Sequence, residues 1–509
     1  MPHSHSRRRL ALAVPVVLSL TASLGFLPAA ASAAPATAPA ARAAENGPNL
    51  AYVVNTRTDR RTIESVRREI ARNGGSLVAG YDRIGVFVVH SAHPEFGARM
   101  RAVRGVDSAG ATRNAPLPAQ STTDTGAPKA LSAQEIAAAG AEATAGQDPL
   151  EPLQWDLPAI KADKAHEKTL GSPDVTVAVI DTGVDDTHPD IAPNFNRADS
   201  VNCVSGRPDT TDGAWRPSAS ESPHGTHVAG EIAAAKNGVG VTGVAPGVRV
   251  AGIKVADPKG YFYTEAVVCG FMWAAEHHVD VTNNSYYTDP WYFNCTGDPD
   301  QRALVDAITR ASRYAERKGT VNVAAAGNER YDLASDSIAD KASPNDGTPS
   351  DRVIDPHTCY DIPTQLPGVV TVAATGAKGL KSSFSNYGLG VIDIAAPGGD
   401  STAYQKPEPP ATSGLILGPL PGGTWGYMAG TSMATPHVAG VAALIKSTHP
   451  HAPASLVKAL LYAEADAVPC TDPYDIDGDG KVDAVCEGAK NDNGFYGHGR
   501  ADALAAVTW

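Results

Sequence analysis

Three polar side chains, far apart in the chain, each occupy a setting that suits covalent catalysis. Asp181 ends the apolar run Val177–Ile180 and precedes a Thr-Gly turn, whereas His224 and Ser432 each lie within two residues of a glycine at the start of a helix-like run of small residues. A serine hydroxyl becomes a nucleophile when an imidazole accepts its proton and a carboxylate orients that imidazole. The sequence therefore predicts Ser432 as nucleophile, His224 as general base and Asp181 as the orienting acid.

The elements that must position these residues are predicted by alternating apolar and helix-like segments from Trp155 onward. Such alternation is typical of a parallel sheet with helices on both faces, in which polar residues at the carboxyl ends of the strands form the site. Asp181, Ser285 and Asn328 all follow apolar runs and are expected at that edge. The predicted strands are Val175–Ile180, Val248–Val255, Val279–Ser285, Thr320–Ala326, Gly368–Ala374 and Val391–Ala395, with helices over Thr264–His277 and Pro299–Lys318.

Four segments together carry a family resemblance, which covers roughly residues 150–509. Asp181–Gly183, His224–Gly230, Ala324–Glu329 and Gly430–Gly440 resemble the motifs of the subtilisin-like serine proteases (subtilases), and the order acid, histidine, serine is that of this family. The resemblance implies a three-layer α/β fold with a mainly parallel central sheet. It implies an endopeptidase that hydrolyses peptide bonds of proteins through an acyl-enzyme. Asn328 would be the side-chain donor to the oxyanion, beside the backbone N–H of Ser432.

The resemblance also implies that a peptide substrate binds as an added strand between two rails. Two departures from the family pattern border this region: Tyr287 stands where a glycine is usual, and the segment from Arg330 to His357 is much longer than the family loop. Broad cleavage and a restricted preference therefore both stay open. The rails would be Ser285, Tyr286 and Tyr287 on one side and Ala325, Ala326 and Gly327 on the other.

Two further histidines are assigned structural roles. His227 lies three residues after His224, on the same helical face, but the glutamate of a zinc-protease helix and an obvious third ligand motif are absent from the sequence around it. His437 follows the Ser432 motif and is expected to pack or hydrogen-bond rather than to catalyse.

A structural Ca²⁺ site is implied by the resemblance, since hard oxygen ligands on loops suit this ion. A ligand near the mature N-terminus, Glu151 or Gln154, is left open, and no organic cofactor is expected. A second acidic loop, residues 475–483, is similar to the first half of an EF-hand loop, although a disulfide-closed acidic turn explains it equally well. The implied ligands are the side chains of Asp190 and Asn237 and the carbonyls of Ala235, Val239 and Val241.

The first 33 residues are predicted to be a secretion signal. Three arginines at positions 7–9 precede the apolar stretch Leu10–Leu27, and Ala31–Ala33 fits the small-residue cleavage pattern. A membrane anchor is the weaker interpretation because Pro15 and Pro28 interrupt or bound the run, and a twin-arginine route ranks second. We expect a secreted, extracellular protein that is free of the membrane once the signal is removed.

Residues 34–113 are predicted to hold a small ferredoxin-like domain, from about residue 48, with the element order β-α-β-β-α-β. In subtilases such a domain is a propeptide that assists folding and then inhibits the enzyme within the same chain. An accessory domain that stays attached is the alternative. Residues 114–150 are expected to be a linker, and residues 151–509 the peptidase domain.

Charge and cysteine content limit which binding partners and which cellular compartment are expected for this protein. The formal net charge of −13 argues against a nucleic-acid-binding protein, while residues 51–113 carry 11 arginines and 6 acidic residues, so a small basic domain adjoins an acidic remainder. Six cysteines in an exported chain favour disulfides over buried free thiols. Cys470 with Cys486 is the best-supported pair. Of the three pairings for the other four, Cys295 with Cys359 and Cys203 with Cys269 is preferred.

Two rival functions remain at this point. One is a catalytically silent, secreted binding protein that keeps the scaffold, and the intact set of four site residues argues against it. The other is a processing protease dedicated to one partner, which would differ only in the selectivity of its pocket. A monomer is expected in either case.

Overall fold

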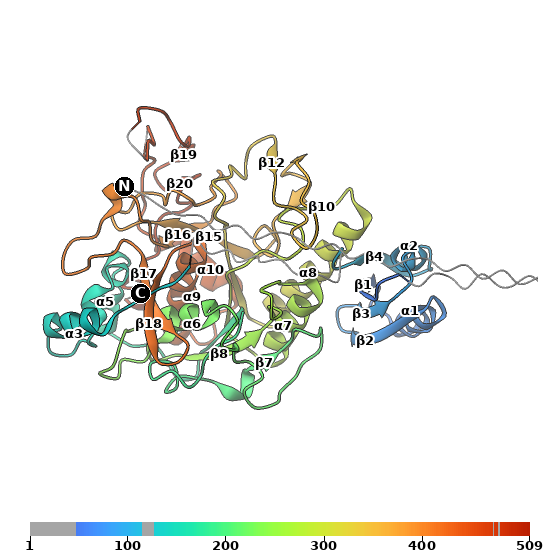
Figure 1. Ribbon diagram of the computed structural model, residues 1–509, viewed down its shortest axis with the longest axis horizontal. Coiled ribbons are helices and arrows are strands. Elements are labelled where there is room, and N and C mark those ends of the chain that lie inside the picture. Colours follow the sequence, from blue (N-terminus) through green and yellow to red (C-terminus); the bar gives the residue numbers. More distant parts are fainter. Residues whose placement is uncertain (1–46, 115–126, 472, 477–478, 509) are drawn as a thin grey trace, which may run out of the picture. The chain divides into compact units, whose positions relative to one another are not determined.

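The computed structural model describes residues 47–114, 127–471, 473–476 and 479–508 (Figure 1). Residues 46–509 form one compact unit. The predicted signal, residues 1–33, lies outside the described residues, as does the middle of the predicted linker.

The first part of this unit is a four-stranded antiparallel sheet with two helices on one face. The strand order β2-β3-β1-β4 and the alternation of elements match the ferredoxin-like domain predicted from the sequence. Apolar side chains of the two helices and of one sheet face form a separate small core, which includes Val54, Val66 and Phe96. The elements are β1 (Leu50–Thr56), α1 (Arg60–Arg72), β2 (Gly75–Tyr81), β3 (Val86–Ser91), α2 (Phe96–Arg101) and β4 (Val106–Ala111).

A seven-stranded sheet forms the centre of the larger part. Its order is β16-β15-β11-β9-β6-β8-β7, and every pair within that order is parallel. All residues of β6 and β15 are buried, as expected for strands covered on both faces. The strands are β6 (Thr176–Asp181), β7 (Val201–Asn202), β8 (Arg249–Lys254), β9 (Val281–Asn284), β11 (Val321–Ala325), β15 (Val369–Thr375) and β16 (Ile394–Pro397), which confirms the six predicted strands with shifts at their ends.

Helices cover both faces of this sheet and complete three layers. On one face, Val177 and Val179 pack with α6, α9 and α10; on the other, Ala178 and Ile180 pack with α7 and α8. The alternation of strand side chains between two faces explains why successive residues of β6 enter different cores. The helices are α6 (His224–Ala233), α7 (Thr264–Glu276), α8 (Pro299–Arg317), α9 (Thr431–Thr448) and α10 (Ala454–Ala463).

The small N-terminal sheet packs its second face against α7 and α8. Val53, Ile84 and Val86 join the core that these two helices form. The amide of Asn55 donates to the carbonyl of Ala303 at 2.8 Å, and the Arg310 guanidinium donates to the carbonyl of Thr56 at 2.6 Å. The small α+β part and the larger α/β part therefore share a continuous apolar interface.

The second half of the predicted linker is structured. Ser132 and Glu135 form a capping box at the start of α3 (Ala133–Glu142). Apolar residues around Ala139 and Leu150 pack with Leu417 and Tyr427 of a hairpin. This hairpin, β17 (Ile416–Leu420) and β18 (Thr424–Met428), also pairs with β5 (Lys129–Ala130). Short helices over Glu151–Leu153 (η1), Asp156–Ala159 (α4) and Ala162–His166 (α5) follow.

All six cysteines are paired as preferred from the sequence. The disulfides join Cys203 to Cys269, Cys295 to Cys359 and Cys470 to Cys486. The second disulfide closes the long insertion that begins after Asn328, and it lies where the short strands β10 (Asn294–Cys295) and β14 (Cys359–Tyr360) pair. The insertion itself holds the hairpin β12 (Ile338–Asp340) and β13 (Arg352–Ile354). The remaining elements are η2 (Arg197–Asp199), η3 (Ala403–Gln405), η4 (Ala505–Val507), β19 (Gly488–Ala489) and β20 (Asp492–Asn493).

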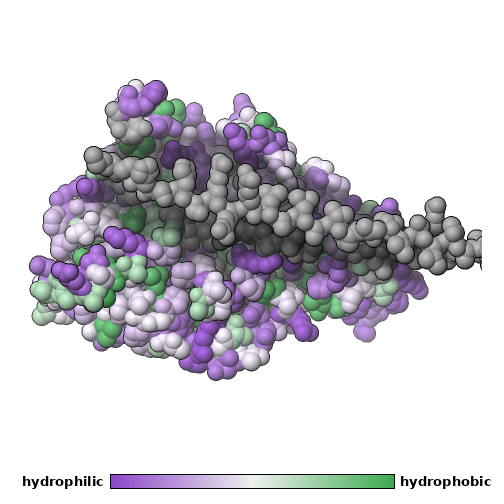
Figure 2. All heavy atoms as spheres, in the orientation of Figure 1, coloured by the Kyte–Doolittle hydropathy of each residue, from purple (hydrophilic) through white to green (hydrophobic). Residues whose placement is uncertain are grey.

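The visible face mixes hydrophilic and hydrophobic residues (Figure 2). The exposed large hydrophobic side chains come from segments scattered between Leu77 and Val485, which is ordinary for a protein surface. Within the described part of the chain, no helix has the length and apolarity needed to cross a bilayer.

Candidate active site

The predicted acid and base meet at the carboxyl end of β6. Asp181 is the last residue of that strand and His224 the first residue of α6; both are buried, and Nδ1 of His224 lies 2.7 Å from Oδ1 of Asp181. The same carboxylate oxygen accepts from the N–H of Thr182 at 2.6 Å. Gly225 permits the close approach, because a Cβ there would lie 2.4 Å from the carbonyl of Gly183. With Nδ1 facing the carboxylate, Nε2 is the nitrogen on the opposite side of the ring.

The predicted nucleophile occupies the start of α9. The hydroxyl of Ser432 donates to the carbonyl of Ser285 at 3.2 Å, and the hydroxyl of Ser285 donates to the carbonyl of Ser432 at 2.9 Å. Ser432 is the second residue of the helix, where backbone N–H groups have no intrahelical acceptor and the helix dipole favours negative charge. This position suits a serine that attacks a substrate carbonyl, because the oxygen of that carbonyl becomes negatively charged during acyl transfer.

Asn328 faces the same helix end from β11. Its Oδ1 accepts from the N–H of Thr431 at 2.8 Å and from the hydroxyl of Thr431 at 3.0 Å. That hydroxyl in turn accepts from the N–H of Gly327 at 3.0 Å. With the carbonyl end of the amide committed to Thr431, the NH₂ end is directed away from it. The sequence did not single out Thr431, since its role depends on contacts 103 and 104 residues away.

Sheet topology explains why these groups converge. In β6, Ile180 is paired with Asn284 of β9, and Asn284 is paired with Ala324 of β11. The residues that follow these strands, Asp181, Ser285 and the Ala326–Asn328 turn, therefore leave the same edge of three adjacent strands. The structure brings the four predicted catalytic residues to this edge, with α6 and α9 packed on one face of the sheet.

The two predicted substrate rails flank this edge. Tyr286 is buried and its ring stacks on Phe262 at 4.6 Å, so it forms part of the core beneath its rail. On the other rail, the N–H of Ala326 donates to the carbonyl of Val372 at 2.9 Å, and its carbonyl accepts from Asn386 at 2.8 Å. The second rail is therefore fixed by hydrogen bonds on its far side.

Tyr287 and the long insertion are directly connected. The amide of Asn345, within the insertion, donates to the hydroxyl of Tyr287 at 2.8 Å and to Asp289 at 2.6 Å. The ring of Tyr287 lies 4.7 Å from that of Tyr292. Tyr287 and the long insertion, the two departures from the family pattern, are thus coupled, because the insertion holds the Tyr287 ring in place at the end of the first rail.

The other two histidines of the motifs have protein partners on both ring nitrogens. His227 contacts Glu231 at 2.7 Å and the carbonyl of Gly426 at 3.1 Å, and burial lowers the pKa of His227 to about 3. His437 contacts the carbonyl of Met433 at 2.7 Å and Asp156 at 3.0 Å. Both are structural here, as predicted.

The residues of the predicted calcium site also lie together. The carboxylate of Asp190 is buried; its Oδ2 accepts from the N–H of Val241 at 3.0 Å and from the indole of Trp425 at 2.7 Å, while Oδ1 has no hydrogen-bond partner among the described residues. Burial, with a smaller contribution from the charge of Asp148, raises the pKa of Asp190 to about 7. Asn237 is exposed and its side-chain oxygen accepts from Val239 at 3.0 Å. A buried carboxylate oxygen with no donor, near a second carboxylate, fits a cation in charge and ligand type.

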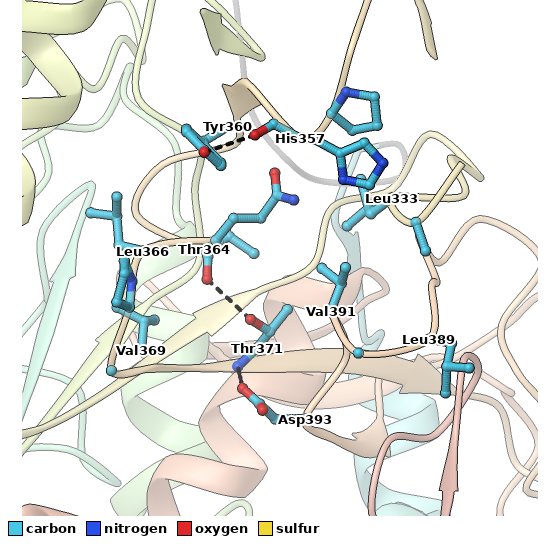
Figure 3. Close-up of a pocket in the computed structure, with 16 residues that line it drawn as sticks. Leu333, His357, Tyr360, Thr364, Leu366, Val369, Thr371, Leu389, Val391 and Asp393 are labelled. Atoms are coloured by element: carbon cyan, nitrogen blue, oxygen red, sulfur yellow. Dashed lines mark hydrogen bonds between the residues drawn. The ribbon is translucent and has the colours of Figure 1, made fainter. Parts of the chain in front are cut away.

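A separate open pocket of about 560 Å³ lies beside β15 (Figure 3). It is lined in part by Thr364, Thr371 and Asp393, and these three are linked because Thr371 donates its hydroxyl to the carbonyl of Thr364 and its N–H to Asp393. None of the four predicted catalytic residues lines it.

Comparisons with known proteins agree with this geometry. The model of the subtilase family matches residues 172–499, so the chain belongs to the subtilase family. It is 32% identical over 298 residues to a subtilisin of Bacillus pumilus, covering 58% of this chain and 86% of that protein. The same identity and length are found for subtilisin NAT of Bacillus subtilis subsp. natto, but there the match spans only 62% of the relative's length.

Solved structures confirm the fold. The epidermin leader peptide processing serine protease EpiP of Staphylococcus aureus superposes with a TM-score of 0.63 at 22% identity, covering 90% of this chain and 98% of that one. Fervidolysin of Fervidobacterium pennivorans, a keratinolytic enzyme related to subtilisin, gives a TM-score of 0.57 at 22% identity, with 91% and 62% covered. The predicted three-layer α/β fold is therefore correct.

Proposed function

We propose that this protein is a secreted serine endopeptidase that hydrolyses peptide bonds through an acyl-enzyme. The observation that carries the proposal is the buried pair of Asp181 and His224, joined at 2.7 Å on the edge where α9 begins with Ser432 as its second residue. Membership of the subtilase family supports it.

In the proposed reaction, Nε2 of His224 accepts the proton of Ser432 as the serine oxygen attacks the peptide carbonyl carbon. Asp181 holds Nδ1 and stabilises the imidazolium that forms. The negative charge on the substrate oxygen is met by the amide of Asn328 and the N–H of Ser432. His224 then returns the proton to the leaving amine, and water cleaves the ester by the same steps with its own proton passing through His224.

Ser432→Ala tests this proposal. The purified variant is expected to lose activity on a peptide p-nitroanilide by about 10⁶ in kcat, the size known for loss of the nucleophile in subtilisin. Ser447→Ala is a matched control, because Ser447 lies on the same helix and, within the described ranges, its hydroxyl bonds only to the carbonyl of Ala443 and the N–H of Ser172. Hydrolysis that persists in purified Ser432→Ala protein would contradict the proposal.

The N-terminal α+β domain is proposed to be a self-inhibitory propeptide. Its last described residues contact the larger part: the Arg113 guanidinium binds Glu265 and lies 3.8 Å above the Tyr263 ring, and the N–H of Asn114 donates to Asp346 at 2.7 Å. An N-terminal read and an intact mass of the active secreted form should show that residues 47–113 are gone. Active material in which they remain covalently attached would refute the precursor model.

Calcium is proposed as a structural ion in the loop around Asp190. Asp190 and Asn237 would supply side-chain oxygens, with the carbonyls of Ala235, Val239 and Val241 completing the set. When bound, the ion would neutralise the buried carboxylate and tie this loop to the segment that follows β6. No step of the proposed reaction depends on it.

A protease dedicated to one substrate remains the second candidate. The contact of Tyr287 with Asn345 and Tyr292 favours it, because a fixed ring beside the first rail narrows what that rail can accept. Profiling the cleavage of a mixed peptide library separates the two candidates, since a general protease cuts after many residue types.

A further inference from the structure

One segment of the chain joins the two substrate rails from below. The N–H of Thr288, directly after the first rail, donates to the carbonyl of Ile362 at 2.8 Å. The hydroxyl of Thr364 donates to the carbonyl of Ala325, in the second rail, at 2.7 Å. The segment from Asp361 to Thr364 therefore forms the floor between the rails; Figure 3 labels its last residue, Thr364, and Tyr360, which directly precedes the segment.

Asp361 begins this floor and is an acid without a counter-charge. Its side chain is 1% exposed, and its Oδ1 has no hydrogen-bond partner in the described residues. Burial, with the negative charge of Glu329 nearby, raises the pKa of Asp361 well above that of an ordinary aspartate. A buried carboxylate in this state costs free energy unless a donor or a cation reaches it.

Glu329 forms the adjoining wall. Its Oε2 accepts from the N–H of Asn328 at 2.8 Å and from the hydroxyl of Tyr292. Glu329 is exposed, and desolvation by the surrounding protein raises the pKa of its carboxyl. Gly327 leaves room for this arrangement, because a Cβ there would lie 2.0 Å from the Tyr292 hydroxyl.

Position relative to the reacting groups identifies which substrate residue meets these acids. Glu329 directly follows Asn328, the proposed oxyanion donor. The floor segment lies between the rail that contains Ser285 and the rail that contains Gly327. The side chain next to the attacked carbonyl therefore enters this space. Among the described residues, neither Asp361 nor Glu329 has a lysine or arginine ion pair, so no cation of these segments competes with a basic side chain of the substrate.

We propose that this pocket selects a basic side chain, arginine above lysine, at the residue whose carbonyl is attacked, with Asp361 at its base and Glu329 on its wall. Arginine ranks first because its planar guanidinium offers five donors to the two carboxylates and the Tyr292 hydroxyl. This inference rests on the proposed endopeptidase function, and it makes the narrower, processing type of cleavage the expected one.

The test compares peptide p-nitroanilides that differ only in the last residue: arginine, lysine, glutamine, norleucine and phenylalanine. The full chain is expressed and the secreted protein assayed as purified. Wild type is expected to favour arginine over norleucine by at least about 100-fold in kcat/KM, and Asp361→Asn should lower the arginine value by about 100-fold. The norleucine value should change less than about threefold in that variant. Glu329→Gln should reduce the arginine preference by a smaller factor, because Glu329 is more solvated.

Asp355→Asn is the matched control. It makes the same substitution six residues earlier, on an exposed turn where Asp355 bonds only to its own loop. An arginine preference in wild type that survives in Asp361→Asn, or a preference for norleucine or phenylalanine in wild type, overturns the inference while leaving the endopeptidase proposal intact.

A binding measurement keeps the two proposals separable. Calorimetry with Ser432→Ala protein compares product peptides that end in arginine or in norleucine. Selective binding of the arginine peptide without hydrolysis by wild type would support the pocket and refute the endopeptidase. Equal binding of both peptides would refute the pocket.

Discussion

Thr431→Val is the most direct probe of how the proposed oxyanion site is built. The substitution keeps the shape of the side chain and removes its hydroxyl, which accepts from the N–H of Gly327 and donates to Oδ1 of Asn328, each at 3.0 Å. The backbone N–H of Thr431 still donates to Asn328 at 2.8 Å. The amide of Asn328 therefore loses one of its two anchors to Thr431 and is loosened rather than removed.

The size of the effect follows from these contacts. Complete loss of such a donor costs about 10²–10³ in kcat, so loosening it is expected to cost roughly tenfold. KM should change little, because the oxygen carries its full charge only in the transition state. The buried N–H of Gly327 is left without its acceptor, which should lower the free energy of unfolding by about 1–3 kcal/mol.

The assay is kcat and KM on a peptide p-nitroanilide, with thermal unfolding followed by calorimetry. Thr431→Ser keeps the hydroxyl and should retain near wild-type kcat. Thr435→Val is the matched control: it removes a hydroxyl one turn along α9 whose one hydrogen bond in the described part of the chain is to the carbonyl of Thr431, at 2.8 Å. An unchanged kcat in Thr431→Val, or an equal loss in Thr435→Val, would refute the reasoning.

Two further predictions concern stability. Lys381 is buried against the rings of Tyr387, Tyr474 and Phe495, and burial lowers its pKa to about 7. Because an unfolded lysine titrates near pH 10.4, the unfolded chain holds the extra proton between these values, and stability should rise from pH 7 to pH 10. Between pH 7 and pH 10, the Tm of wild type should therefore rise relative to the Tm of Lys381→Met. A difference in Tm that stays constant with pH would count against a lowered pKa for Lys381. Removing calcium with a chelator should lower the Tm of wild type but not of Asp190→Asn; an equal response in both proteins would argue against the proposed site.

Local patterns were sufficient for most of the fold. The runs ending at Asp181 and before Asn328 are strands because β-branched and small apolar residues cover both faces of a buried sheet, and the capping box at Ser132 specifies its helix through neighbours three residues apart. The candidate catalytic residues could be proposed from the sequence for a related reason. Each is embedded in a contiguous motif whose glycines and strand end fix its backbone position.

The pocket was not predictable in this way. Asp361 stands between Tyr360 and Ile362 in no recognisable motif, and nothing in its neighbours along the chain shows that the negative charge of Glu329, 32 positions earlier, is near enough to help raise its pKa. Thr431 carries no sign of its bond to Gly327 either. Such contacts depend on how loops after different strands are brought to one sheet edge, and no local spacing encodes them.

The sequence alone determined the sheet, its covering helices and the identity of four side chains suited to acyl transfer, because period and motif are properties of short segments. Only the tertiary structure decided that the 2.7 Å bond between Asp181 and His224 forms, that the insertion holds Tyr287, and that Asp361 is buried with no hydrogen-bond partner for its Oδ1 among the described residues. These depend on the parallel order of β6, β9 and β11, which sets distant residues side by side through the packing of the whole chain.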